Sequence, residues 1–497
     1  MASFAASSTE AKLLEIITSF DSPPPSYLIH DVKNVPILFY VCYIGSTALF
    51  DALRQRSFCN IDVNALNSAT HSLKGTSPLW AALSMGHTPV AQSLLDCGAD
   101  VNVMYDPKVA PSPLILAAQN GLQSSVDFIL SYLHTHAPTP DFVRSFLSLR
   151  LPSADGATAL FKASQNGHAS IVRSLLSSGA SVNAVTLDDH ASPLSIASFK
   201  GHLSVVSQLL AHPDIKVGKA SEDTRLPPLH AAARGGHADC LSLLLARLES
   251  SSGDVDAVAD GELTALHVAC GSSHGDSAVV TLLLVAGADA SKACIGSGLT
   301  PLMLACGKGH TAVVSLLLSK SQEREAEGKS SLREARSSKE DGLRTPLLFA
   351  VESKAHGVVK LLLQNGAHVH AGVTSLSSTA ASSSSAAVVG PFTALHIAAV
   401  NNDPEMVSLL LAYGADVERR AEWKRPGTTG KVGAVSARAI ANQCDFLECS
   451  NLLMEASRRT TPIDTSDKNV VVPDCFKEAA AAMDAMALAG KNEKPPK

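Results

Sequence analysis

The stretch that decides the fold is TALHVACGSSHGDSAVVTLLLVAGADASKACIGSGLTPLMLACGKGHTAVVSLLL, residues 264–318. It opens with TALH at 264–267 and a run of small residues. A turn containing glycine and histidine follows, and then an apolar run that ends in three leucines. The same pattern restarts with TPL at 300–302. Self-similarity over a unit of this length predicts a solenoid, in which each unit is stabilised by stacking on its neighbours.

The opening of this unit recurs along much of the chain. Each copy carries a leucine at its third position, and these leucines are Leu79, Leu114, Leu160, Leu194, Leu229, Leu266, Leu302, Leu347 and Leu395. The four intervals from Leu160 to Leu302 are 34, 35, 37 and 36 residues, and longer intervals elsewhere mark insertions. A decayed copy follows at Ala437. The period indicates one supersecondary unit repeated many times.

The residues of one unit predict two helices and a loop. Pro301 falls at the first position of a helix, where its missing N–H costs nothing and its φ is already helical. Gly309 supplies a turn with positive φ between the two helices. Residues 313–317 then give the second helix an apolar stripe. Gly287 ends such a helix, and the Asn and Asp residues that follow it favour a hairpin-like finger.

These openings, turns and endings resemble the ankyrin repeat. The openings include SPLWAA (77–82), SPLSIA (192–197), PPLHAAA (227–233), TALHVA (264–269), TPLMLA (300–305), TPLLFA (345–350) and TALHIAA (393–399), the turns are Gly-His pairs such as 201–202 and 309–310, and the endings include GADVN (98–102) and GADV (414–417). The resemblance implies an all-α solenoid of about 10–11 helix-turn-helix units with β-hairpin-like finger loops. It also implies a non-enzymatic scaffold that binds a protein partner on a concave surface of fingers and first-helix faces.

The sequence divides into a repeat array and two flanking segments. Residues 1–34 form a leader with a short amphipathic helix, residues 35–456 the repeat array, and residues 457–497 a tail with one candidate helix. Three insertions are expected within the array, near 131–157, 319–344 and 372–390. We expect an extra helix in the first, a helical extension or a mobile loop in the second, and disorder in the third because it is rich in Ser and Ala.

The composition limits the classes of partner. The chain has 497 residues and a formal net charge of −6, so bulk charge favours neither nucleic acid nor membrane. Its ten cysteines include no CxxC pair, which predicts reduced thiols in the cytoplasm or the nucleus. The first 20 residues contain Glu10 and no basic segment, so they do not resemble a secretory signal. We expect a monomeric array.

Residues 35–50 (VPILFYVCYIGSTALF) carry no charge and allow a membrane-associated alternative. A helix needs about 20 apolar residues to cross a bilayer, and this stretch is shorter and contains Pro36 and Gly45. We therefore interpret it as a degenerate first repeat.

No residue pattern points to catalysis or to a cofactor. The chain contains neither HExxH nor GxSxG, and we expect no enzyme activity, cofactor or metal. His267, Cys270 and His274 have a spacing that could hold zinc on a helix. The resemblance instead implies that His267 ties the opening of its unit together by hydrogen bonds, with Cys270 a packing residue and His274 part of the turn.

The finger tips are the best candidates for partner contact, because the fold does not fix their residues. The candidates are Met104, Tyr105, Leu187, Asp188, Asp189, Arg419, Arg420, Trp423, Lys424 and Arg425. A tryptophan among arginines is typical of protein interfaces. The alternative is that Trp423 packs on the end of the stack and the basic residues are solvated. A single basic finger does not favour nucleic-acid binding.

A second hypothesis for the function is an adaptor. In that case the repeats bind one protein, and the leader or the tail helix recruits a second one, such as a ubiquitin ligase.

Overall fold

The computed structural model describes most of the repeat array. The described residues are 37–55, 63–64, 75–100, 112–136, 139–150, 156–217, 226–250, 253–259, 262–326, 331–337, 343–373, 392–423 and 433–460. The predicted leader helix and tail helix lie outside these residues, as do Met104, Tyr105, Lys424 and Arg425.

The described residues form eleven helix pairs, in agreement with the predicted all-α solenoid. The first helices are α2 (Ile37–Ile44), α4 (Pro78–Met85), α6 (Pro113–Asn120), α9 (Ala159–Gln165), α11 (Pro193–Lys200), α13 (Pro228–Gly235), α15 (Ala265–Gly271), α17 (Pro301–Lys308), α19 (Pro346–Glu352), α21 (Ala394–Val400) and α23 (Ala437–Gln443). The second helices are α3 (Thr47–Gln55), α5 (Thr88–Asp96), α7 (Gln123–His136), α10 (Ala169–Ser177), α12 (Leu203–Leu210), α14 (Ala238–Ser250), α16 (Ser277–Val285), α18 (Thr311–Ala326), α20 (His356–Gln364), α22 (Pro404–Ala412) and α24 (Leu447–Thr460).

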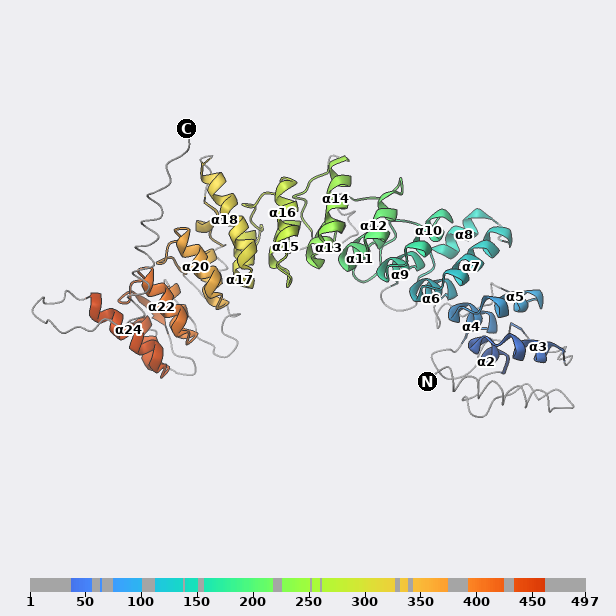
Figure 1. Ribbon diagram of the computed structural model, residues 1–497, viewed down its shortest axis with the longest axis horizontal. Coiled ribbons are helices and arrows are strands. Elements are labelled where there is room, and N and C mark those ends of the chain that lie inside the picture. Colours follow the sequence, from blue (N-terminus) through green and yellow to red (C-terminus); the bar gives the residue numbers. More distant parts are fainter. Residues whose placement is uncertain are drawn as a thin grey trace, which may run out of the picture.

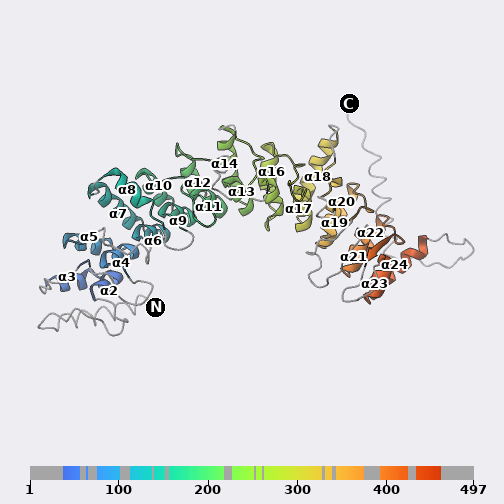
Figure 2. The ribbon, with the colours of Figure 1, turned by 180° about the vertical axis from the view of Figure 1, so that it is seen from behind.

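The units stack in one curved row. Each first helix contacts the first helices of the neighbouring units, so that α11 lies between α9 and α13. Figure 1 shows the first helices along the inner edge of the arc and the second helices along its outer edge. The view from behind shows the same order, with α19, α21 and α23 on the inner edge at the C-terminal end (Figure 2). The first helices therefore form the concave face.

Local chemistry explains where each first helix begins and ends. In α17 the Oγ1 atom of Thr300 accepts a hydrogen bond from the N–H of Met303, and Pro301 follows as the first helical residue. This arrangement satisfies one of the free N–H groups at the helix start. Gly309 ends the helix with a φ of 75°, a conformation in which a side chain would be strained.

The core runs through the whole array between the two helix layers. In the α17–α18 unit Leu302, Ala305 and Val314 are fully buried. Alanines at the first-helix positions allow neighbouring helices to pack closely. Because each unit buries its apolar side chains largely against its neighbours, the array is stabilised by its interfaces.

A polar ladder joins successive fingers. The side chain of Asn183 accepts a hydrogen bond from the N–H of Lys216 at 3.1 Å and donates one to the carbonyl of Asp214 at 2.7 Å. The carboxylate of Asp256 accepts from the N–H of Asp289 at 3.0 Å. These bonds fix the finger of each unit on that of the next.

Most described fingers are turns without strands, within the predicted solenoid with hairpin-like finger loops. Strands occur in two places: β1 (Gly372–Val373) pairs with β2 (Phe392–Thr393), and β3 (Arg420–Trp423) pairs with β4 (Gly433–Ser436), both antiparallel. Short fingers close within a few residues, which is too short a length for two strands to pair. Gly372 and Val373 thus lie in a strand, although they belong to the segment in which disorder is predicted.

The first insertion contains the helix α8 (Pro140–Leu147), as the sequence predicts. Thr139 caps it, and Val143 and Leu147 are buried in the core of the array. In the second insertion α18 continues the helix to Ala326, and a 3₁₀ turn, η3 (Leu332–Glu334), follows.

Residues 37–55 form the first helix pair and are not one long helix. Gly45, with a φ of 76°, separates α2 from α3. Among the described residues, no helix combines the length and the apolarity that crossing a membrane requires.

Candidate functional site

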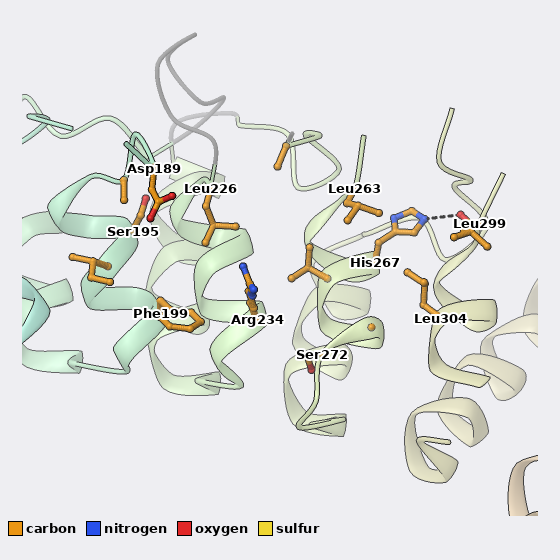
Figure 3. A pocket seen from close by; sticks show the side chains of 15 residues that line it. Asp189, Ser195, Phe199, Leu226, Arg234, Leu263, His267, Ser272, Leu299 and Leu304 are labelled. Carbon is orange, nitrogen blue, oxygen red and sulfur yellow. Dashed lines mark hydrogen bonds between the residues drawn. The ribbon is translucent and has the colours of Figure 1, made fainter. Parts of the chain in front are cut away.

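A groove crosses the inner face of four units in the middle of the array. It has a volume of about 810 Å³ and extends from α11 to α17. Its apolar side chains from the helices are Ile196, Phe199, Val268 and Leu304, and those from the loops before α13, α15 and α17 are Leu226, Leu263 and Leu299. Figure 3 labels five of these side chains, Phe199, Leu226, Leu263, Leu299 and Leu304, around the groove. We call this site the central groove.

The helical period places these side chains on the inner face. Counted from the N-cap residue, the fifth and eighth residues of each opening are on one side of the first helix. In α11 these are Ile196 and Phe199, which are half-exposed, whereas Leu194 and Ala197 are buried. The N-cap residue Ser192 accepts the N–H of Ser195 at 3.0 Å and so fixes where this period starts.

Glycines leave the floor of the groove open. The eighth position of the opening is glycine in two adjacent units, Gly271 and Gly307.

Gly235 lies next to Arg234, and a Cβ atom there would meet the carbonyl oxygen of Phe199 at 2.5 Å. At Gly235 no side chain fits without a shift of the backbone, because α11 and α13 are in close contact beneath the groove.

The groove is lined by one cation, Arg234, and one carboxylate, Asp189, and a second cation, Lys200, lies beside it. The guanidinium of Arg234 lies 5.9 Å from the ring centre of Phe199, and the ammonium of Lys200 lies 5.7 Å from the same ring. Such distances permit a cation–π attraction. Asp189, from the finger before α11, also lines the groove, on the same side as Ser195 and Phe199 (Figure 3).

The finger that carries Asp189 is held by the first insertion. The guanidinium of Arg150 donates to the carbonyl oxygens of Val185 at 2.6 Å and Gly156 at 2.9 Å. Leu187 lies against Gly156, although 60% of it is exposed. The insertion therefore supports one wall of the groove.

Histidines of the openings stabilise the stack behind the groove. The Nε2 atom of His267 donates to the carbonyl of Leu299 in the next unit at 3.1 Å, and its Nδ1 atom lies 2.8 Å from Oγ1 of Thr264. Burial lowers the pKa of His267 below its usual range. The ring is thus neutral at pH 7, with its proton on Nε2.

Histidines of the turns form a second ladder. In five units Nε2 donates to a carbonyl near the end of the preceding first helix, with His87 bonded to Tyr43, His168 to Gln119, His202 to Gln165, His237 to Phe199 and His310 to Ser272, at 2.7–3.2 Å. These rings are part of the scaffold. Both ladders fix the units beside the groove relative to one another.

The zinc alternative does not fit this arrangement. Both ring nitrogens of His267 are engaged in hydrogen bonds within the repeat. Cys270 is fully buried, and burial raises the pKa of its thiol far above the usual range. His274 is exposed in the turn, and the three side chains do not form a cluster that could hold a metal ion.

The structure brings few of the predicted finger residues to the central groove. Asp189 lines it, and Leu187 and Asp188 are exposed on the same finger. Arg420 and Trp423 begin and end strand β3, and Arg419 precedes it, near the C-terminal end of the array. They are far along the arc from the groove (Figure 1).

Sequence reasoning missed the groove residues on the helices. Ile196, Phe199, Arg234, Val268 and Leu304 occupy positions inside the repeat opening, which resemble conventional packing positions. An alignment of the openings with one another could have indicated these groove residues. The fifth and eighth positions vary in size and charge, whereas the sixth position is alanine in every opening from α4 to α23.

Comparison with known proteins finds a family model and a solved structure that match this chain. The family model described as ankyrin repeats in three copies matches residues 5–141, 114–220, 194–292, 271–373 and 341–421. A crystal structure of the human ASB11 ankyrin repeat domain covers 54% of this chain and 98% of that one, with 27% identity and a TM-score of 0.40.

Two curated relatives are similar over part of the chain. The ankyrin repeat and KH domain-containing protein mask-1 of Caenorhabditis elegans is 28% identical over 276 residues, which are 50% of this chain and 10% of mask-1. Alpha-latrotoxin-Lg1a of Latrodectus geometricus is 33% identical over 95 residues, which are 19% of this chain and 7% of the toxin. The chain thus spans about a tenth or less of these relatives. Since the family model matches most of its length, the chain belongs to the ankyrin-repeat family.

Proposed function

We propose that this protein is a non-enzymatic scaffold that binds a segment of another protein in the central groove. One observation carries the proposal: apolar side chains from four units, among them Ile196 and Leu304, remain half-exposed around a common space of about 810 Å³. Apolar surface gathered in a concave site is typical of binding sites.

The rigidity of the stack favours this function. The histidine bonds of His237 and His310 fix the first helices on either side of the groove. A site that is already ordered loses little conformational entropy when a ligand binds. Binding energy from the apolar contacts is then available for affinity.

The remaining parts of the proposal follow from the sequence. The sequence contains neither HExxH nor GxSxG, which supports a non-enzymatic role. We place the protein in the cytoplasm or the nucleus, as a monomeric array. The unpaired thiols of Cys42 and Cys306 support a reducing compartment.

The experiment compares a groove variant with an outer-face variant. Leu304→Glu introduces a charge into the groove, and Val285→Glu makes a similar change at an 81% exposed residue of the outer helix α16. Proximity labelling in the native cell should recover a set of proteins with the wild type and with Val285→Glu. The same set should be depleted for Leu304→Glu.

Thermal unfolding of the purified proteins provides the control for folding. Leu304 is only half-buried, so we expect both variants to remain folded. Equal labelling by a folded Leu304→Glu variant would rule out the groove as the binding site.

A further inference from the structure

An arginine, a phenylalanine and a carboxylate form a closed cluster at the start of α19. The guanidinium of Arg344 lies 4.3 Å from the ring centre of Phe349. Its Nη1 atom donates to Oε2 of Glu352 at 2.7 Å, and the two charged side chains are only 8% and 12% exposed. Within this unit the chain thus supplies the anion that an arginine stacked on a ring can bind.

The central groove contains an arginine and a phenylalanine, and its one lining carboxylate, Asp189, is not paired with the arginine. Arg234 faces Phe199 at 5.9 Å, as Arg344 faces Phe349. Among the described residues no carboxylate forms an ion pair with Arg234, and its side chain is exposed. The guanidinium keeps its hydrogen-bond donors available to a ligand.

The position of Arg234 in the array is unusual. It is the eighth residue of its opening, and from α4 to α23 the residues at this position are Ser84, Gln119, Gln165, Phe199, Arg234, Gly271, Gly307, Glu352, Val400 and Gln443. Arg234 is the one cation in that column of described residues. In the next two units the eighth position is glycine, Gly271 and Gly307. These units therefore present no side chain to the guanidinium from that position.

We propose that the groove recognises an extended protein segment in which an Asp or Glu is adjacent to an apolar residue. This inference rests on the proposed function. The carboxylate of the ligand pairs with Arg234 beside Phe199. The apolar side chain packs against Val268 and Leu304, in the space that Gly271 leaves open. This arrangement reproduces, between two proteins, the cluster that Arg344 forms within the chain.

The charges around the groove favour a carboxylate over a phosphate or a nucleic acid. A phosphate group carries nearly two negative charges, and here it would meet the carboxylate of Asp189 as well as the two cations beside Phe199, Arg234 and Lys200. The planar fork of arginine matches a carboxylate or a phosphate in a bidentate geometry, so the preference for the smaller charge of a carboxylate rests on the repulsion by Asp189. The formal charge of the chain, −6, also opposes a polyanion.

The test uses a library of random peptides displayed on phage and selected against the full chain. We expect the selected peptides to be enriched in Asp or Glu adjacent to an apolar residue. A hydrogen-bonded charge pair contributes about 1.5–3 kcal/mol, so Arg234→Gln should weaken the binding of a selected peptide about 10- to 100-fold in fluorescence anisotropy. Replacing the acidic residue of the peptide by its amide should cause a similar loss, and the two changes together should cost little more than either one.

Two further variants separate this inference from the proposed function. Lys308→Gln removes an exposed cation of α17 that does not line the groove, and it should leave the affinity unchanged. Leu304→Glu should abolish the binding of any peptide that occupies the groove.

Each outcome decides between the two proposals. Peptides that lose affinity with Leu304→Glu, but carry no acidic preference and bind Arg234→Gln equally well, would overturn the carboxylate inference and leave the groove as the binding site. An equal effect of Lys308→Gln and Arg234→Gln would also overturn it, because the attraction would then be unspecific. If no peptide is selected, or if the selected peptides bind Leu304→Glu unchanged, the proposed function itself is wrong.

Discussion

Pro227 leaves one nitrogen of His230 without a partner. In two other units Nδ1 of the opening histidine lies 2.7–2.8 Å from the hydroxyl of a threonine N-cap, namely His267 with Thr264 and His396 with Thr393. Pro227 has no hydroxyl group, and Nδ1 of His230 is buried without a hydrogen bond. An unsatisfied buried polar atom lowers the stability of the folded state.

Pro227→Thr should therefore be more stable than Pro227→Ala. Both variants lose the proline ring, but only threonine supplies a hydroxyl group to Nδ1 of His230. We expect a difference of about 1 kcal/mol in the free energy of unfolding, measured by urea denaturation. Equal stability of the two variants would show that Nδ1 needs no partner at this position.

The turn glycines have two separate roles. Gly201 has a φ of 77°, and a Cβ atom there would lie 2.5 Å from Nδ1 of His237 in the next unit. Gly179 has a φ of 90°, and a Cβ atom there would meet nothing within 4 Å. The first glycine makes room for a ring, and the second only permits the backbone conformation.

We expect Gly201→Ala to cost more stability than Gly179→Ala. Both changes place alanine at positive φ, which costs about 1–2 kcal/mol. Gly201→Ala adds a clash with His237, so its total cost should be larger by about 1–3 kcal/mol in chemical denaturation. The extra cost should largely disappear when His237 is also replaced by alanine. If the extra loss of stability persists in the Gly201→Ala, His237→Ala double variant, the clash with His237 is not its cause.

At the scale of elements, the insertion that carries α8 positions a finger of the groove. Arg150 donates to the carbonyls of Val185 and Gly156, and Leu187 packs on Gly156. An element outside the repeat thus fixes the loop that carries Asp189. The sequence predicts the extra helix, but the pairing of Arg150 with a carbonyl 35 residues away follows only from the structure.

Arg150→Ala should loosen this finger and leave the neighbouring helix intact. Hydrogen exchange followed by mass spectrometry should be faster in residues 185–191 and unchanged in α11, because the two bonds from Arg150 are lost. The control is Arg144→Ala on α8, whose partner Asp141 is exposed on the surface. The assigned role would be wrong if both variants exchanged like the wild type.

At the scale of the whole molecule, buried histidines link the stability of the array to pH. Burial lowers the pKa of His230 and of His396 to about 4, from a usual value of 6.5, and it also lowers the pKa of His267. Between pH 6.5 and 4 the unfolded chain binds protons at these side chains and the folded chain does not. The stabilisation is complete above pH 6.5 and is lost as the pH falls to about 4.

We expect the free energy of unfolding to fall by about 3 kcal/mol for each of His230 and His396 across this range. The matched variant is His230→Met, because Met303 occupies the corresponding position in its own unit. Urea denaturation at pH 7 and at pH 4.5 should show a smaller loss of stability for this variant than for the wild type. An identical pH dependence would mean that His230 does not titrate as proposed.

The number of units and the order of their elements could be predicted from the sequence, because each unit contains its own signals. A capping Ser or Thr, a proline at the helix start and a glycine at the turn act within a few residues. The apolar period of residues 313–317 also lies within one helix. The sequence did not indicate which fingers form strands, because pairing such as that of β3 with β4 needs more residues than a short finger has.

The candidate site could be predicted only in part. The sequence indicated Asp189, because finger residues are free of the repeat pattern, but it also indicated Arg419 and Arg420, which are far from the groove. It did not indicate Phe199 or Arg234, which belong to the openings of two different units. Phe199 and Arg234 come close together only because α11 stacks on α13.

The sequence by itself therefore determined that this chain is an ankyrin-repeat array, where its units begin, and that a concave face exists. Only the tertiary structure decided which residues meet on that face. The physical reason is the range of the interactions. Caps, turns and amphipathic stripes are formed by residues close in the chain, whereas the groove is formed by Ile196, Arg234, Val268 and Leu304, one from each of four stacked helices.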